Sequence, residues 1–122
     1  MVGIAARLTP IKNIPTLLRA FAKAYAKNPR LRLKIAGSGE DEASLKSLAQ
    51  RLNIAKRVDF VGWITDMREF FAGVDINVLS SFSETFPYSL LEGAYEHCAA
   101  IASRAGGIPE LIAHGESGYL FE

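Results

Sequence analysis

Two glutamates, Glu84 and Glu92, stand eight positions apart in a segment that joins an expected strand to an expected helix. The apolar run 76–79 before them is typical of a buried strand, and the run after them has helical spacing, with Leu91, Ala94, Tyr95 and Cys98 on one face. Pro87 suits the first turn of this helix, where its missing N–H is not needed. In an open α/β sheet, ligands bind where the carboxyl ends of strands face helix N-termini. We therefore expect a ligand site at this turn.

Two cations, Arg7 and Lys12, follow the expected first strand, residues 2–6. An arginine offers a planar fork of donors that suits phosphate, and a lysine offers a flexible point charge. Two solvated loop cations are the alternative interpretation. The glutamates downstream favour the phosphate interpretation.

Strands and helices alternate along the whole chain. The expected strands are residues 2–6, 31–36, 58–62, 76–79, 99–103 and 118–121. This alternation predicts an α/β fold: a Rossmann-like, doubly wound parallel sheet of about six strands in three layers, α/β/α. The expected strand order is 3-2-1-4-5-6, which reverses between the first and fourth strands. The loops after those two strands carry Arg7, Lys12 and Glu84.

Helix ends are also marked in the sequence. Asn13 is expected to cap the first helix, and Asn28-Pro29 to end it. Thr65 is expected to cap a short helix that contains Met67, Phe70 and Phe71.

The composition fits one domain, because 122 residues suffice for a single core but not for two. The net charge is +1 and the charges are scattered, which gives no support to a nucleic-acid partner. No apolar run approaches membrane-spanning length. The single cysteine, Cys98, excludes an internal disulfide and fits a reducing, cytoplasmic compartment. We interpret it as a buried apolar residue.

Other polar and glycine motifs carry weaker signals. His97 and His114 have no serine or cysteine to pair with, and no cluster has metal-ligand spacing, so no metal is expected. Gly37-Ser38-Gly39 lacks the third glycine of a dinucleotide fingerprint, so that motif is not expected here. A plain turn is the simpler interpretation of these three residues. Gly106-Gly107 allows positive φ and close backbone approach. We interpret Trp63 as a packing residue rather than as a stacking platform.

The glutamate segment resembles the signature of retaining GT-B glycosyltransferases of group 1 (family 4), which use nucleotide-sugar donors. Ser83-Glu84 and residues 90–94 match that signature. Residues 7–13 resemble the phosphate-binding loop of the family, where an arginine and a lysine stand at this spacing. The family commonly has Gly-Phe-Gly where this chain has Thr85-Phe86-Pro87, so Pro87 removes one backbone donor.

The resemblance implies a donor site that needs no metal or other cofactor. Arg7 and Lys12 would hold the diphosphate of a nucleotide-diphosphate sugar, on which negative charge grows as it departs. Glu92 would accept hydrogen bonds from two ribose hydroxyls, and Glu84, the catalytic residue, would contact the donor sugar or the reacting centre. The other implied donor-binding residues are Thr85, Phe86, Gly37, Gly62 and Gly107.

The resemblance also identifies residues 1–122 as a single nucleotide-sugar-binding domain, the C-terminal half of a GT-B enzyme. The N-terminal acceptor domain and the helix after the last strand would be missing, and the abrupt start in a strand favours a piece cut from a longer chain. The intact enzyme would transfer a hexose-type sugar to a glycan or lipid, with peripheral association with a membrane. The isolated chain would be inactive or nearly so. Apolar surface left open would promote a homodimer.

Three other interpretations stay open. Half of a nucleotide-sugar epimerase shares the two-domain fold, although the glutamate pair and the Arg7–Lys12 loop favour a transferase. A non-catalytic, flavodoxin-like signalling domain fits the length. A receiver domain of that kind needs acidic residues where this chain has Arg7, and an aspartate where it has Gly62. The third is a domain that merely folds or self-associates.

Overall fold

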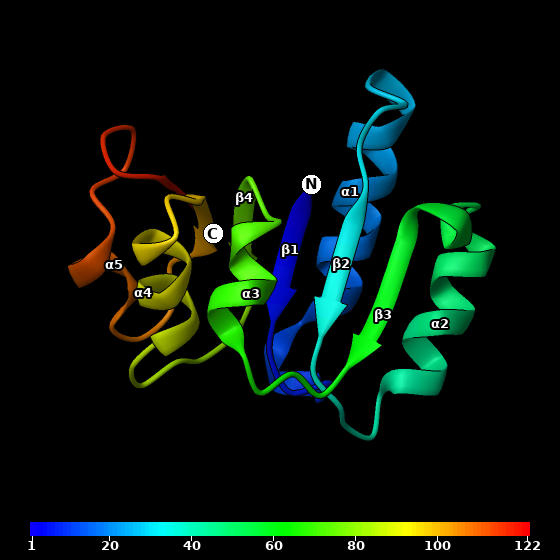
Figure 1. The fold of residues 1–122 in the computed structure, drawn as a ribbon, viewed down its shortest axis with the longest axis horizontal. Coiled ribbons are helices and arrows are strands. Elements are labelled where there is room, and N and C mark those ends of the chain that lie inside the picture. Colours follow the sequence, from blue (N-terminus) through cyan, green and yellow to red (C-terminus); the bar gives the residue numbers. More distant parts are fainter.

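A parallel sheet of six strands runs through the centre of the computed structural model, which describes residues 1–122 (Figure 1). The strand order is β3-β2-β1-β4-β5-β6, which confirms the predicted topology. The strands are β1 (Val2–Ala5), β2 (Leu33–Ala36), β3 (Val58–Gly62), β4 (Ile76–Leu79), β5 (Ala99–Ser103) and β6 (Tyr119–Phe121). Because the order reverses between β1 and β4, the loops that follow these two neighbouring strands frame one opening at the carboxyl edge of the sheet.

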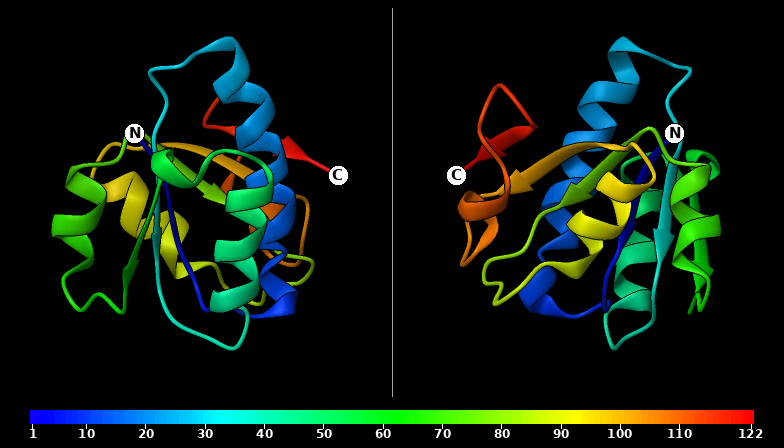
Figure 2. Two further views of the ribbon diagram at one scale, coloured as in Figure 1. Left: turned by 90° about the vertical axis from the view of Figure 1, so that its right-hand side faces the viewer. Right: turned by 60° about the vertical axis from the view of Figure 1, so that its left-hand side comes forward.

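Helices cover both faces of the sheet and complete the three predicted layers. They are α1 (Ile14–Lys27), α2 (Glu42–Arg51), α3 (Met67–Ala72), α4 (Tyr88–Tyr95) and α5 (Ile108–Leu111), with short 3₁₀ turns at Pro10–Lys12 and Ala55–Arg57. Helices α1 and α2 lie on one face, and α3, α4 and α5 lie on the other (Figure 1, Figure 2). None of these helices is long and apolar enough to cross a lipid bilayer.

The strands are apolar on both faces because each face is covered. In β1, Val2 and Ile4 belong to the cluster under α1 and α2, whereas Ala5 packs with the cluster under α3. In β4, Val78 points to the α1 side and Leu79 to the cluster under α4 and α5. This is the near-continuous apolar pattern expected of parallel strands.

One of the two predicted N-caps is wrong. Asn13 stands at the N-cap of α1, as predicted, but its backbone is left-handed (φ 51°) and its side chain accepts from the Thr16 hydroxyl at 2.8 Å instead of from a backbone amide. Asp66, not Thr65, caps α3, because its carboxylate accepts from the backbone N–H of Glu69 at 3.0 Å. A carboxylate at this place both satisfies a free amide and favours the positive end of the helix.

The predicted buried face of α4 is wrong. Leu91 and Tyr95 are 42% and 76% exposed, and the helix instead buries Leu90 and Gly93. Gly93 lies directly against the Asn77 side chain of β4, where a Cβ would collide with the amide nitrogen of Asn77. That nitrogen donates to the Ser89 carbonyl at 2.8 Å. The close contact of Gly93 with the sheet therefore determines which face of α4 is buried. The prediction was wrong because it considered only the spacing of apolar side chains, and a glycine has none. The helix also ends before Cys98.

An apolar groove lies beside α1 on the face of β4, β5 and β6 opposite α4. It measures about 320 Å³, and ten of the twelve residues that line it are hydrophobic. The lining includes Leu17, Ala20 and Ala24 of α1, Val78 of β4, Ile101 of β5 and Phe121 of β6. The predicted homodimer through exposed apolar surface stays a prediction, and this groove is a candidate for that surface.

Candidate functional site

A cleft of about 690 Å³ opens at the carboxyl edge of the sheet, at the point between β1 and β4 where the strand order reverses. Its walls come from the segments after β1, β2, β3 and β4 and from the first turns of α4. Six of the predicted site residues line it: Arg7, Lys12, Gly37, Glu84, Phe86 and Glu92. The structure therefore brings together residues that lie up to 85 positions apart in the sequence (Arg7 to Glu92).

The two cations of the cleft have different environments. Arg7 is exposed, lines the cleft and makes no ion pair or side-chain hydrogen bond, so its guanidinium donors are free. Lys12 is partly buried, and its ammonium lies 2.6 Å from Oε1 of Glu84. The cleft therefore holds one free cation and one that is paired with the catalytic candidate.

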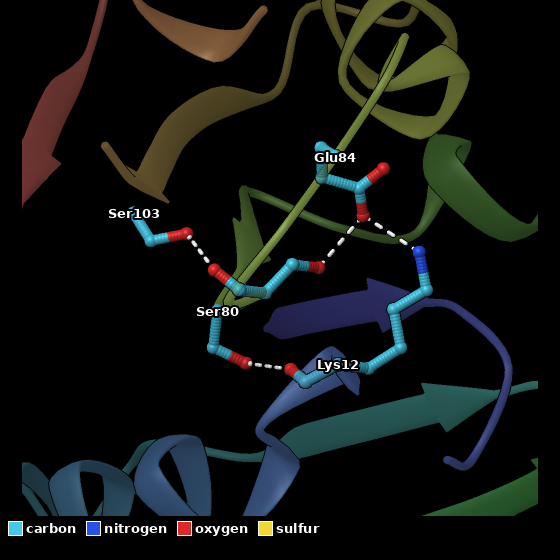
Figure 3. A network of polar contacts seen from close by, with 5 residues as sticks. Lys12, Ser80, Glu84 and Ser103 are labelled. Carbon is cyan, nitrogen blue, oxygen red and sulfur yellow. Dashed lines mark hydrogen bonds and ion pairs between the residues drawn. The ribbon is translucent and has the colours of Figure 1, made fainter. Parts of the chain in front are cut away.

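Glu84 is held from two sides (Figure 3). Its Oε1 accepts from the Lys12 ammonium at 2.6 Å and from the Ser81 hydroxyl at 2.7 Å. Its side chain is only 9% exposed. A buried carboxylate needs such partners, since desolvation of an unpaired charge is costly.

Backbone and serine contacts join the two loops that frame the cleft. The Ser80 hydroxyl donates to the Lys12 carbonyl at 2.9 Å, and the Phe82 amide donates to the Ile11 carbonyl at 2.8 Å. The Ser103 hydroxyl of β5 donates to the Ser81 carbonyl at 2.6 Å (Figure 3). These contacts fix the loop after β1 and the loop after β4 as one unit.

The loop after β5 packs against the loop after β4 that carries Glu84. Gly106 has φ +49°, and a Cβ there would overlap the carbonyl of Glu84. A Cβ on Gly107 would lie 2.9 Å from the carbonyl of Thr85. Thr85 and Gly107 do not line the cleft, so their position indicates support of the loop; a donor contact stays a prediction.

The opposite wall of the cleft is formed by α4 and by the segment after β3. Glu92 is exposed on the first turns of α4 and faces the cleft. Trp63 lines the cleft and is 72% exposed, so its interpretation as a packing residue is wrong. Gly62 does not line the cleft, but its carbonyl accepts from the Gly37 amide at 2.8 Å and holds that turn in place.

Three residues of this site were missed by the sequence analysis: Ser80, Ser81 and Ser103. A signal existed for the first two, because two consecutive serines directly after an apolar strand place hydroxyls at its carboxyl end. All three serines are buried, at 2%, 2% and 7% exposure. Nothing in the local sequence links Ser103 to Ser81, since their contact depends on the pairing of β4 with β5.

The residues that were set aside as non-catalytic lie away from the cleft lining. The Nδ1 atom of His114 accepts from the Leu120 amide at 2.9 Å, and His97 has a left-handed backbone, φ 65°. Cys98 is buried, which confirms its interpretation. Burial raises the pKa of its thiol, and the carboxylates of Asp75 and Glu96 raise it further. No group of three or more His, Cys, Asp or Glu side chains is arranged to hold a metal ion.

Known structures have the same architecture. HepE from Anabaena, solved in complex with UDP-glucose, superposes with a TM-score of 0.91 at 29% identity, over 98% of this chain and 34% of that one. The C-terminal domain of the group 1 glycosyl transferase LpcC from Francisella tularensis gives a TM-score of 0.88 at 29% identity, over 99% of this chain and 66% of that domain. The fold is thus the Rossmann-like α/β domain of GT-B glycosyltransferases.

Sequence comparison names the family. All of residues 1–122 match glycosyl transferases group 1, and the chain belongs to this family. It is 35% identical over 112 residues to the N-acetyl-alpha-D-glucosaminyl L-malate synthase of Bacillus anthracis. This alignment covers 92% of this chain and 29% of that enzyme. It is 32% identical over 116 residues to the lipopolysaccharide core biosynthesis glycosyltransferase LpsE of Rhizobium meliloti, over 95% of this chain and 33% of LpsE. The chain spans about a third of the length of these relatives.

Proposed function

We propose that this chain is the donor-binding domain of a retaining, metal-independent glycosyltransferase of family 4. The observation that carries the proposal is the convergence of Arg7, Lys12, Glu84 and Glu92 on one cleft at the point where the strand order reverses. Each is a residue type that a nucleotide-diphosphate sugar requires, and the position is the one where open α/β sheets bind ligands.

The cations have the role of stabilising the leaving diphosphate. As the bond between the anomeric carbon and the diphosphate breaks, its electron pair goes to the diphosphate oxygen and negative charge grows there. Fixed cations that already face this position stabilise the transition state without a metal ion. Arg7 offers a free guanidinium, and Lys12 has further N–H donors beside the one that Glu84 accepts.

The carboxylates have separate roles because their environments differ. Glu92 is exposed at the start of α4, where a carboxylate can accept from two vicinal hydroxyls of the ribose. Glu84 is 9% exposed, is paired with Lys12 and lines the cleft, and the family resemblance assigns it contact with the donor sugar or the reacting centre. The other donor contacts come from Phe86 and Gly37 in the lining, with Thr85, Gly62 and Gly107 behind them.

Relatives support a hexose-type donor carried by UDP. The HepE structure contains UDP-glucose, and the relative from Bacillus anthracis is named an N-acetyl-alpha-D-glucosaminyl L-malate synthase. The acceptor would be a glycan, a lipid or a similar molecule, and the parent would work in the cytoplasm with peripheral association with a membrane.

The chain contributes only one side of the catalytic cleft. Trp63 and Tyr88 line it and are 72% and 68% exposed, which suits the approach of a second, acceptor-binding domain. We propose that this N-terminal domain belongs to the parent enzyme and that residues 1–122 alone are catalytically inactive, since one half of the cleft cannot orient an acceptor. Turnover by the isolated chain would contradict this.

Calorimetric titration of the chain with UDP and with GDP tests the proposal. We expect saturable binding of one of them in the presence of EDTA, unchanged by added magnesium. Arg7→Ala and Glu92→Ala should each weaken it about tenfold or more, as expected for the loss of charge-assisted hydrogen bonds. Arg104→Ala and Glu116→Ala are matched controls outside the cleft lining. Absence of binding to a folded wild-type chain, or equal losses in the controls, would contradict the proposal.

A further inference from the structure

Ser81 places a buried hydroxyl beside the catalytic candidate. It is 2% exposed, and its hydroxyl donates to Oε1 of Glu84 at 2.7 Å (Figure 3). Its own carbonyl accepts from the Ser103 hydroxyl at 2.6 Å, so the backbone that carries this donor is held by the neighbouring strand β5. The donor therefore has a fixed position.

Both hydrogen bonds to the Glu84 carboxylate fall on the same oxygen. Lys12 and Ser81 each donate to Oε1, and no side chain donates to Oε2. In Figure 3 two dashed lines meet at one carboxylate oxygen of Glu84, one of them from Lys12, and no dashed line reaches the other oxygen. A lysine alone, on a flexible four-carbon stem, would leave the carboxylate free to rotate about its last torsion. A second donor on the same oxygen fixes the plane of the carboxylate.

We propose that Ser81 is a positioning residue that commits Oε1 of Glu84 to the protein and leaves Oε2 for the donor sugar. This inference rests on the proposed function, because it needs a sugar in the cleft. A purely structural role for Ser81, satisfying a buried carboxylate, would change the stability of the loop without changing sugar recognition selectively.

The test compares UDP with UDP-glucose, because only the second carries the sugar that Glu84 would contact. The affinities of the 122-residue chain are measured by calorimetry for both ligands. In Ser81→Ala, the affinity for UDP-glucose should fall about tenfold, the loss expected for one hydrogen bond to a charged group, while the affinity for UDP changes less than about twofold. Ser81→Thr keeps the hydroxyl and should restore most of the UDP-glucose affinity.

Two further variants separate positioning from folding. Ser80→Ala removes the buried hydroxyl next in sequence, which donates to the Lys12 carbonyl, and should weaken UDP and UDP-glucose alike. In a Glu84→Ala background, Ser81→Ala should cause no additional loss of UDP-glucose affinity, because the two residues act through one carboxylate. If Ser81→Ala does not fold, Ser81→Cys replaces it in the test, because the thiol is similar in size to the hydroxyl but is a weak hydrogen-bond donor.

The outcomes distinguish this inference from the function on which it rests. Equal losses of UDP and UDP-glucose in Ser81→Ala, no loss of either, or an additive loss in the Glu84→Ala background would overturn the role of Ser81 alone. Failure of the folded wild-type chain to bind UDP would overturn the proposed function, and this role with it.

Discussion

The ammonium of Lys12 lies 2.6 Å from Oε1 of Glu84, although the two residues are 72 positions apart in the sequence. The contact joins the loop after β1 to the loop after β4 at the point where the sheet order reverses. The side chains are 21% and 9% exposed, so the pair is largely shielded from water. The ion pair therefore contributes both to the stability of the cleft and to the placement of the proposed catalytic carboxylate.

Lys12→Met keeps most of the aliphatic stem and removes the charge. It should lower the free energy of unfolding by about 2–4 kcal/mol, because the buried Glu84 carboxylate loses its cation. Adding Glu84→Gln should recover part of that loss, since the double variant buries no unpaired charge. Urea denaturation of the two single variants and the double variant measures the coupling. Additive losses would show that the two side chains do not stabilise each other.

Gly106→Ala should destabilise the chain through two effects. The residue has φ +49°, and its Cβ would overlap the Glu84 carbonyl. Gly115 is the matched control, because it has φ +81° but no atom within 4 Å of a built Cβ. Gly115→Ala should cost only about 1–2 kcal/mol for its left-handed backbone, and Gly106→Ala should cost clearly more. Equal losses in urea denaturation would contradict a tight contact under Glu84.

Gly93→Ala should displace α4 from the sheet because its Cβ would collide with the Asn77 amide. The expected loss is about 1–3 kcal/mol, the usual cost of overpacking. In an Asn77→Ala background the amide group is gone and only the Cβ of residue 77 remains, 3.2 Å from the added methyl, so the loss from Gly93→Ala should shrink. A denaturation cycle of the four chains checks this, and an unchanged loss in the Asn77→Ala background would be inconsistent with the contact.

The raised pKa of Cys98 predicts a pH-dependent stability in the alkaline range. Unfolding exposes the thiol, whose pKa then returns to about 8.5, so above this pH the unfolded state binds fewer protons than the folded one. The free energy of unfolding should therefore fall as pH rises from about 8.5 towards the raised native pKa. The slope should not exceed about 1.4 kcal/mol per pH unit. The difference between wild type and Cys98→Ala isolates this contribution; parallel pH profiles would contradict it.

The apolar groove beside α1 predicts association of the isolated chain into a homodimer. Ala24 lines the groove, whereas Ala26 is exposed on α1 outside it. Sedimentation should show concentration-dependent dimers for wild type and for Ala26→Glu, and monomers for Ala24→Glu, because a carboxylate in the groove is costly to bury. The same association in all three would place the contact elsewhere.

Sequence patterns predicted the fold and most of the cleft because both follow from rules that are local or topological. Alternation of apolar runs and amphipathic helices predicts the parallel sheet, and the order of its strands brings Arg7 and Glu84 to one edge. The errors arose where the tertiary structure, and not the local sequence, decides how a helix or a side chain is oriented. Gly93 oriented α4 through Asn77, and Trp63 is exposed in the cleft although an isolated tryptophan suggests packing. The role of Ser103 requires the pairing of β4 with β5, which no local pattern reveals.

The most direct test of the central claim, that Arg7, Lys12, Glu84 and Glu92 form one donor site, is to locate the bound ligand on the chain. A chain of 13.3 kDa is suitable for amide NMR, and UDP-glucose can be titrated in the presence of EDTA. We predict that the largest shift changes fall on the loop after β1, on Gly37 and on residues 82–92. A separate hollow lies between α2 and β3 and is lined by Gln50 and Phe60. Amides beside this hollow should stay unchanged. Changes confined to that hollow or to the groove beside α1, or no changes at saturating ligand, would contradict the account.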